Sequence, residues 1–312
     1  MRESTNRMLR LPPFVLVTPA RDEAQFIELT IQSVIAQTAR PLKWVIVSDG
    51  STDGTDDIVK RYTVANDWIE LLRMPERAER NFAGKVHAFN AGEARVKELP
   101  YEVIVSLDAD VTFEKDFFSY LLDKMVADPM LGLAGTPIVE ASGETYDYRR
   151  VGIEHVSGAC QVFRRECFEA IGGYAPVKGG LIDVIAVITA RMKGWKTRTF
   201  TDMVCLHKRE MGTVQCGPVQ AKFKYGAKDY ALGNHPIWEL FRVAYQMTRK
   251  PFALRGLALG AGYLWAAIRH RERPVSSEFV VFHRKEQMHR LASVLTGKTF
   301  LGKHTTAQKH KA

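Results

Sequence analysis

Cysteine is scarce in this chain, and its N-terminal segment lacks a hydrophobic run. The 312 residues include 4 cysteines, which have neither metal-ligand spacing nor the density of a disulfide framework. A reducing, cytosolic setting is therefore favoured. The opening residues, MRESTNRMLRLPP, contain no apolar core that could act as a secretory signal. We therefore expect a protein that works in the cytoplasm.

Two common phosphate-binding signatures are also missing. The sequence contains no GxxxxGK[ST] motif and no GxGxxG motif, which argues against a P-loop and against a dinucleotide-binding fingerprint. The hydrophobic fraction of 46% and the charged fraction of 25% are those of an ordinary folded protein. The length suits one large α/β domain, or one domain with a sizeable extension.

Acidic residues are few in the C-terminal third. Residues 204–312 carry 19 Lys and Arg against 6 Asp and Glu, whereas the preceding residues carry 25 against 29. A basic segment can bind nucleic acid or an anionic membrane surface. Here it flanks the apolar stretch 252–268, which favours the membrane surface over nucleic acid. The stretch could form an interfacial helix, a short transmembrane helix or a core helix, and we expect interfacial attachment.

Short apolar runs alternate with amphipathic helical patterns over the first half of the chain. This alternation predicts an α/β fold with a mainly parallel central sheet and helices on both faces. The predicted strands are 14–17, 44–47, 69–72, 103–107, 133–139 and 199–204, and the predicted helices are 24–37, 56–62, 85–94, 117–126, 165–171 and 184–192. Because ligands of such sheets bind at the carboxyl ends of the strands, residues 18–21, 48–53 and 108–110 are expected to lie together.

Two carboxylates follow directly after the predicted strand 103–107. Asp108 and Asp110 are separated by one residue, so on an extended backbone they share a face and can converge on one ligand. Hard cations such as Mg²⁺ prefer oxygen ligands, and Mg²⁺ is often held by one or two carboxylates together with substrate phosphates. The same D-x-D pattern also occurs in solvated turns, so the pair alone leaves both interpretations open.

A second polar segment, VSDGSTDGT, follows the predicted strand 44–47. Asp49 stands at the strand tip, where its carboxylate can accept a hydrogen bond from a base or a ribose hydroxyl. The alternative is a polar turn that begins the next helix, with glycines that permit tight turns and Asp, Ser and Thr as helix caps.

The order of several sequence blocks resembles that of the family 2 glycosyltransferases. The blocks are TPARDEAQFIELTIQSVIAQT, VIVSDGSTDGT, NFAGKVHAFNAG, VIVSLDAD and a later GGY…GGLID…GW, and they run from Phe14 to Trp195. The resemblance implies a GT-A fold, inverting transfer of a sugar from a nucleotide-sugar donor, and use of a divalent cation, Mn²⁺ or Mg²⁺. The QxxRW signature of processive polysaccharide synthases is absent, which favours transfer of a single sugar.

The resemblance also implies roles for individual residues. The residues expected to bind the nucleotide-sugar are Thr18, Ala20, Arg21, Asp49, Lys85 and Asp108. Asp110 corresponds to the direct metal ligand, and Asp108 to the residue that contacts the ribose or a metal-bound water. His207 is a candidate further metal ligand, and Arg209 a candidate phosphate contact.

Inverting transfer also needs a base that accepts the proton of the acceptor hydroxyl. The family supplies this carboxylate from a Glu-Asp pair at the start of a helix, and the corresponding residue here is Asp183. Ile182 occupies the position of the Glu, which puts a second carboxylate role in doubt. A helix-capping role is the alternative for Asp183.

The predicted organisation and partners follow from these observations. We expect an N-terminal tail at 1–12, a GT-A domain at 13–215 with a nucleotide-binding half at 13–112 and an acceptor half at 113–215, a helical, membrane-associated extension at 216–300 and a basic tail at 301–312. The expected acceptor is a lipid-linked saccharide or a glycan at the inner face of the cell membrane, and no nucleic acid is expected to bind.

Two rival functions are a nucleotidyltransferase and a catalytically inactive scaffold protein of the family. A nucleotidyltransferase would be expected to show a Gly-rich phosphate loop after the first strand, but residues 11–37 contain no glycine.

Overall fold

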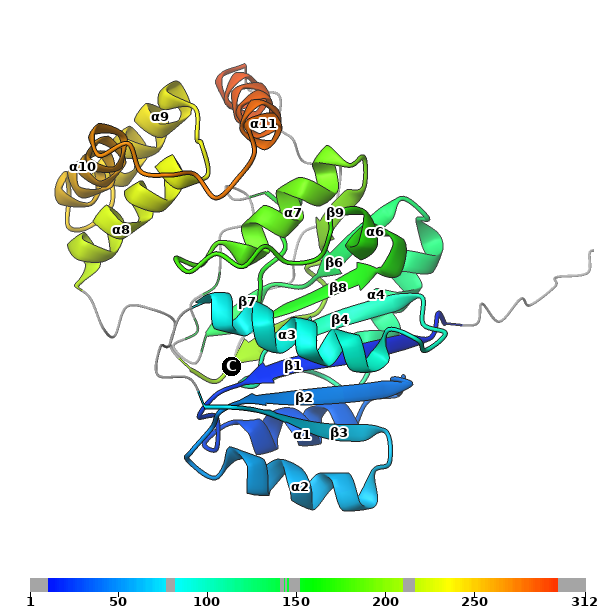
Figure 1. The fold of residues 1–312 in the computed structure, drawn as a ribbon. Coiled ribbons are helices and arrows are strands. Elements are labelled where there is room, and N and C mark those ends of the chain that lie inside the picture. Colours follow the sequence, from blue (N-terminus) through cyan, green and yellow to red (C-terminus); the bar gives the residue numbers. More distant parts are fainter. Residues whose placement is uncertain are drawn as a thin grey trace, which may run out of the picture. The chain divides into compact units, whose positions relative to one another are not determined.

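A seven-stranded sheet organises the first of two structural units, Met1–Gln215 and Cys216–Ala312 (Figure 1). The computed structural model describes residues 11–76, 82–140, 143, 145, 152–209 and 217–296. The strands of the large sheet lie in the order β3-β2-β1-β4-β8-β6-β9. The pairings of β4 with β8 and of β6 with β8 are antiparallel and the remaining pairings are parallel, so β8 alone is reversed among these seven strands.

Helices and strands alternate along the first unit, as the sequence predicts. The strands are β1 (Phe14–Ala20), β2 (Lys43–Asp49), β3 (Ile69–Met74), β4 (Val103–Leu107), β5 (Val111–Thr112), β6 (Leu131–Gly135), β7 (Ile138–Glu140), β8 (Cys160–Arg164), β9 (Lys196–Thr199) and β10 (Cys205–His207), and the helices are α1 (Ile27–Ile35), α2 (Thr55–Ala65), α3 (Phe82–Val96), α4 (Phe117–Ala127), α6 (Arg165–Ala170) and α7 (Ile182–Met192). The predicted α/β architecture, with its mainly parallel sheet, is therefore confirmed.

Both faces of the large sheet are covered by helices, as Figure 1 shows. Strand β1 illustrates the reason, because its successive side chains point to opposite faces. Leu16 packs in one buried cluster with residues of α1, α2 and α4, whereas Val15 and Val17 pack in a second cluster with residues of α3, α6 and α7. A strand that is buried on both faces reads as a continuous apolar run rather than an alternating one.

Two predicted strands are wrong in their limits. The segment 133–139 is not one strand: β6 ends at Gly135, and β7 begins at Ile138 after Pro137, which has no N–H to continue a ladder. The segment 199–204 is likewise not a strand, since β9 ends at Thr199 and β10 begins at Cys205. At both breaks the chain leaves the large sheet and enters a small sheet with the order β5-β10-β7. The apolar pattern alone does not show this change of sheet.

The described part of the second unit is helical. Its helices are α8 (Pro218–Ala231), α9 (Pro236–Met247), α10 (Leu254–Ile268) and α11 (Ser277–Leu295). Helix α10 covers most of the apolar stretch 252–268. Among the described residues, no helix is both long enough and apolar enough to cross a membrane.

Candidate functional site

The predicted site residues of the first loops lie at the carboxyl ends of β1, β2 and β4. Arg21 follows β1, Asp49 ends β2, and Asp108 follows β4. Because β1 pairs in parallel with both β2 and β4, their ends meet at one edge of the sheet. Arg21 Nη1 lies 3.9 Å from Asp49 Oδ2, and Asp49 is buried. The structure therefore brings these two predicted nucleotide-binding residues together.

Lys85 reaches the same edge from helix α3. Its ammonium group makes an ion pair with the carboxylate of Asp108, and both side chains are partly buried. Burial alone would lower the pKa of Lys85, yet the nearby carboxylates of Asp108 and Asp183 raise the pKa above its ordinary value. Lys85 is therefore held as a cation beside the strand that carries the D-x-D pair.

Asp110 is held by two residues that come from the far end of the first unit. His207 Nε2 lies 3.3 Å from Asp110 Oδ1, and Arg209 Nε lies 3.3 Å from Asp110 Oδ2. The cause is the small sheet, in which β10 pairs with β5 and places His207 opposite Val111. Burial opposes ionisation of Asp110, but the hydrogen bond from His207 and the charges of His207 and Arg209 hold its pKa below the usual range.

Glu23 is a residue of this cluster that the sequence analysis did not select. It makes an ion pair with Arg209, so that Arg209 bridges Glu23 and Asp110. Burial and the charge of Asp110 raise the pKa of Glu23 to about 7, against the charge of Arg209. The signal available in the sequence was its place in the TPARDEA block, two residues after Arg21.

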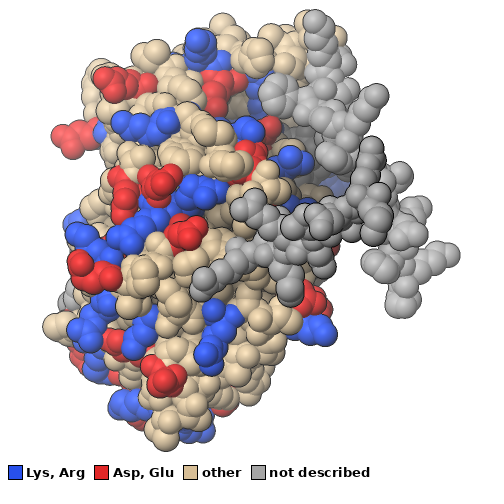
Figure 2. Space-filling view, turned by 90° about the vertical axis from the view of Figure 1, so that its right-hand side faces the viewer, with Lys and Arg blue, Asp and Glu red and all other residues tan. Residues whose placement is uncertain are grey.

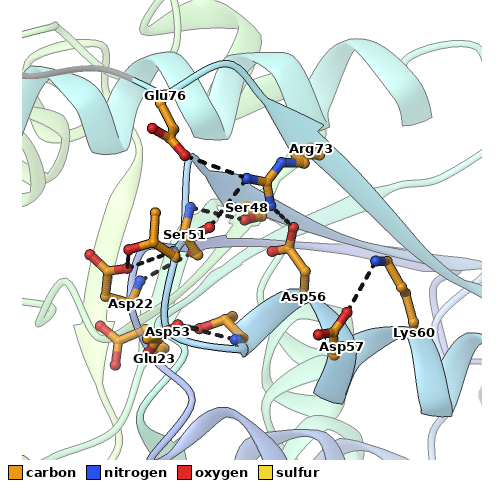
Figure 3. Close-up of polar contacts among 12 residues, drawn as sticks. Asp22, Glu23, Ser48, Ser51, Asp53, Asp56, Asp57, Lys60, Arg73 and Glu76 are labelled. Atoms are coloured by element: carbon orange, nitrogen blue, oxygen red, sulfur yellow. Dashed lines mark hydrogen bonds and ion pairs between the residues drawn. The ribbon is translucent and has the colours of Figure 1, made fainter.

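The polar residues of the second loop mainly hold the first loop in place (Figure 3). The backbone N–H of Asp22 donates to Ser51 Oγ at 3.1 Å, and the N–H of Thr52 donates to Asp22 Oδ1 at 3.0 Å. The N–H of Ala24 donates to Asp53 Oδ2 at 2.8 Å. Asp53 fits the polar-turn interpretation of VSDGSTDGT, because its Oδ1 accepts from the N–H of Thr55 at 3.1 Å, although the N-cap of α2 is Gly54. Asp49 instead lies at the strand tip beside Arg21.

Thr18 and Ala20 are buried at the end of β1. Thr18 Oγ1 accepts a hydrogen bond from Trp44 Nε1 at 2.9 Å. The Thr18 hydroxyl thus ties β1 to β2 below the site, and contacts of Thr18 and Ala20 with a nucleotide stay a prediction.

Asp183 lies in the first turn of α7 and is partly buried. A Cβ atom added at Gly158 would lie 3.0 Å from Asp183 Oδ2, so the carboxylate packs directly on this glycine. The next residue, Ala159, accepts a hydrogen bond from the Asp108 N–H at 2.8 Å. The segment 158–159 thereby places the predicted base close to the D-x-D pair.

The donor atoms around Asp110 fit a divalent cation in part. A carboxylate and an imidazole, both buried, are 3.3 Å apart, and these groups together suit Mn²⁺. No group of three or more His, Cys, Asp or Glu in the described ranges forms a complete metal site. Asp110 and His207 would therefore hold the ion together with ligands from outside the protein, as is usual for metals bound to substrate phosphates.

Part of the chain is similar in sequence to known proteins. Residues 15–159 match the model of the Glycosyl transferase family 2. A poly-beta-1,6-N-acetyl-D-glucosamine synthase of Staphylococcus aureus (strain COL) is 30% identical over 117 residues, which are 37% of this chain and 26% of that protein. The corresponding synthase of Staphylococcus epidermidis is 23% identical over 174 residues, 48% of this chain and 39% of that protein. The chain thus matches about a quarter to two fifths of the length of these relatives.

Solved structures show the same fold. The mannosyltransferase PcManGT from Pyrobaculum calidifontis, solved with GDP-Man and Mn²⁺, has a TM-score of 0.56 at 20% identity, covering 92% of this chain and 83% of that one. GalNAc-T7, solved with UDP, GalNAc and Mn²⁺, has a TM-score of 0.56 at 14% identity, covering 94% of this chain and 59% of that one. The family match identifies residues 15–159 as a family 2 glycosyltransferase region, and the shared architecture shows that the chain has the GT-A fold.

Proposed function

We propose that this chain transfers one sugar from a nucleotide-diphosphate sugar to the hydroxyl of a lipid-linked saccharide or glycan, with inversion at the anomeric carbon. The observation that supports it best is the convergence of Asp108, Asp110, Lys85 and Arg209 at one edge of the sheet, with Asp183 close by. Cell-surface polysaccharide synthesis is the proposed setting, because the Staphylococcus relatives are named as poly-N-acetylglucosamine synthases.

The donor would bind along the loops that follow β1, β2 and β4. Asp49 would accept a hydrogen bond from the nucleoside, with Arg21 fixing its carboxylate. Lys85 and Arg209 are the cations available to the diphosphate, and each already lies against a carboxylate that the diphosphate would have to displace or share. Asp108 would face the ribose, and Asp110 with His207 would hold the divalent cation.

The transfer step forms a bond from the acceptor oxygen to the anomeric carbon and breaks the bond from that carbon to the diphosphate. Asp183 takes the proton of the acceptor hydroxyl as the oxygen attacks. A divalent cation, when bound, neutralises the charge that accumulates on the leaving nucleoside diphosphate. Lys85 and Arg209 add positive charge at the same place, which stabilises the transition state more than the ground state.

Substitution of Asp183 and Asp110 tests the proposal. We expect Asp183→Asn to lower transfer about a hundredfold or more, the usual contribution of a general base, and to keep nucleotide binding. Asp110→Asn should instead abolish the stabilisation by nucleotide and Mn²⁺ in a thermal-shift assay, because bound ligand stabilises only the folded state. The substitution Asp123→Asn, at an exposed carboxylate on α4, is the matched control.

The donor screen uses UDP-, GDP- and dTDP-sugars with Mn²⁺ or Mg²⁺, and the products separate the rival functions. From these donors and an acceptor a glycosyltransferase releases nucleoside diphosphate, whereas a nucleotidyltransferase releases pyrophosphate only when it is given a nucleoside triphosphate and a sugar 1-phosphate. Unchanged transfer by Asp183→Asn would contradict the assignment of the base. Absence of any stabilisation by these donors with either cation would support the inactive scaffold.

A further inference from the structure

Helix α9 buries charge and exposes apolar side chains. Glu239 is 3% exposed and is the single residue of α9 that is fully buried. Its exposed positions include Ile237, Leu240 and Phe241, and Leu240 is 68% exposed. An amphipathic helix on a protein in water normally turns its apolar stripe to the core and its charges outward. The apolar stripe of α9 is turned the opposite way.

A buried ionic network holds α9 in this orientation. Arg242 Nη1 lies 2.6 Å from Asp229 Oδ2 of α8 and 3.6 Å from Glu239 Oε2. Asn234 Nδ2 donates to Glu239 Oε2 at 3.3 Å, and the Asn234 carboxamide oxygen accepts from Gln287 of α11 at 2.8 Å. Buried charges are costly to desolvate and add little net stability. Their consequence here is orientation, because they fix which side of α9 faces its neighbours.

Helix α10 also exposes an apolar stripe. Leu254, Leu257, Leu264 and Ile268 are 53%, 55%, 59% and 76% exposed, and their spacing places them on one side of the helix. The opposite side of α10 packs closely on α8, since a Cβ atom added at Gly262 would lie 2.0 Å from the Phe223 carbonyl oxygen. The exposed stripe runs the length of the helix, and 15 residues span about 22 Å.

The two stripes lie on the same side of the unit. A Cβ atom at Gly256 would lie 2.5 Å from the Val243 carbonyl oxygen and 2.9 Å from Met247 N, and one at Gly260 would meet Val243. Contacts that advance along α10 thus move backward along α9, so the two helices run antiparallel. Around the axis of each helix, the exposed stripe lies about a quarter turn from the side that contacts the other helix. The direction of this rotation, viewed from the N-terminus of each helix, is the same in α9 and α10. For an antiparallel pair, this puts both stripes on one continuous surface, the α9–α10 face.

Basic residues, and no acidic ones, accompany this face. Within the sequence 240–271 there is no Asp or Glu, whereas Lys250, Arg255, Arg269 and Arg271 lie near the ends of α10. The surface in Figure 2, by comparison, mixes basic and acidic side chains. Trp265 is 41% exposed, and the Arg271 guanidinium lies over its ring at 5.4 Å. Tryptophan and basic residues beside an apolar stripe are typical of helices that lie in a bilayer interface.

We propose that the α9–α10 face is a monotopic membrane-binding surface, seated in the headgroup region of an anionic bilayer with its apolar stripe toward the acyl chains. Association with a second copy of the chain would also cover the stripe, but two equally basic rims would repel each other. The inference deepens the proposed function by naming the surface that brings the enzyme to a lipid-linked acceptor. It rests on the proposed function only for the reason why the enzyme would attach to a membrane, because binding to lipid itself needs no sugar transfer.

Vesicle flotation with the full chain tests the proposal. The probe is vesicles of phosphatidylcholine with about 30% phosphatidylglycerol, compared with phosphatidylcholine alone. We expect wild type to float with the anionic vesicles and Leu257→Glu/Leu264→Glu to bind them about a hundredfold more weakly, because two leucines no longer enter the interface. The control Leu42→Glu/Val64→Glu adds the same charge at exposed residues of the first unit and should bind like wild type. Lys250→Gln/Arg269→Gln should weaken binding to anionic vesicles about thirtyfold while leaving the weak binding to neutral vesicles unchanged.

Two parallel measurements keep the outcomes separate. Stabilisation by nucleotide and Mn²⁺ reports on the first unit, and circular dichroism shows that the variants are folded. Equal flotation of wild type and the folded Leu257→Glu/Leu264→Glu variant would overturn the proposal, and so would a dimer in sedimentation velocity that this variant dissociates without any lipid binding. Loss of flotation with unchanged nucleotide binding supports it. Flotation without nucleotide binding would instead contradict the proposed function alone.

Discussion

Glu239→Gln tests the buried network of the second unit. In the folded chain, burial and the charge of Asp229 together raise the pKa of Glu239 from 4.5 to about 7, against the charge of Arg242. The folded state therefore binds the proton more tightly than the unfolded state does. The resulting stability is fully present below about pH 4.5 and is lost as the pH rises through about 7. The glutamine keeps the shape of the protonated side chain and has no charge to lose.

The magnitude follows from the two pKa values. A rise from 4.5 to about 7, at about 1.4 kcal/mol per pKa unit, corresponds to about 3 kcal/mol between the two ends of the titration. Most of it should be lost between about pH 5 and about pH 8. We expect Glu239→Gln to be more stable than wild type at the higher pH by about 2 to 3 kcal/mol, and to lose this advantage at the lower pH.

Urea denaturation followed by circular dichroism at the two pH values measures the difference. Comparing variant with wild type at each pH removes the contribution of other titrating groups, including Glu23. Glu272→Gln makes the same charge change at an exposed residue of the same unit and should not alter the pH profile. A Glu239→Gln profile parallel to that of wild type would refute the reasoning, because the buried carboxyl would then not be the titrating group.

Three further outcomes are expected. Gly158→Ala should lower kcat about tenfold to a hundredfold, because its methyl group displaces the Asp183 carboxylate, while thermal shifts show unchanged nucleotide binding. Thr18→Val should destabilise the chain by about 1 to 3 kcal/mol in urea, since the buried Trp44 N–H loses its acceptor, whereas Thr18→Ser keeps the hydroxyl and should cost less. Removal of divalent cations with EDTA should abolish the nucleotide-induced thermal shift, and Mn²⁺ in excess should restore it; a shift that survives EDTA would contradict the role of Asp110.

Much of the first unit could be predicted from the sequence because its local patterns agree with its tertiary structure. The strand predicted at Val103–Leu107 is found with the same limits, since a short, fully apolar run between polar segments has few other possibilities. Arg21, Asp49 and Asp108 lie at the same edge of the sheet because the parallel strands that they follow or end have their carboxyl ends there. The fold was confirmed and the family model matches residues 15–159, whereas the roles of these residues stay predictions.

The remaining features depend on contacts that no local pattern encodes. His207 and Arg209 reach Asp110 through the small sheet, whose strands are two or three residues long and carry almost no periodic signal. The exposed face of α9 was missed for a different reason. Its hydrophobic pattern is that of an ordinary amphipathic helix, and only the ion pair between Arg242 and Asp229 shows that the polar side faces inward.

The charge balance of the site argues for a cation as part of donor binding. Glu23, Asp108, Asp110 and Asp183 gather around two permanent cations, Lys85 and Arg209. Those cations are already engaged with carboxylates, so a diphosphate entering alone would meet a cluster with more acidic than basic groups. Repulsion between like charges is stronger in a partly buried cluster than in bulk water. A divalent ion on Asp110 and His207 would reverse the local sign, so the same carboxylates that oppose the free diphosphate would then hold the ion that attracts it.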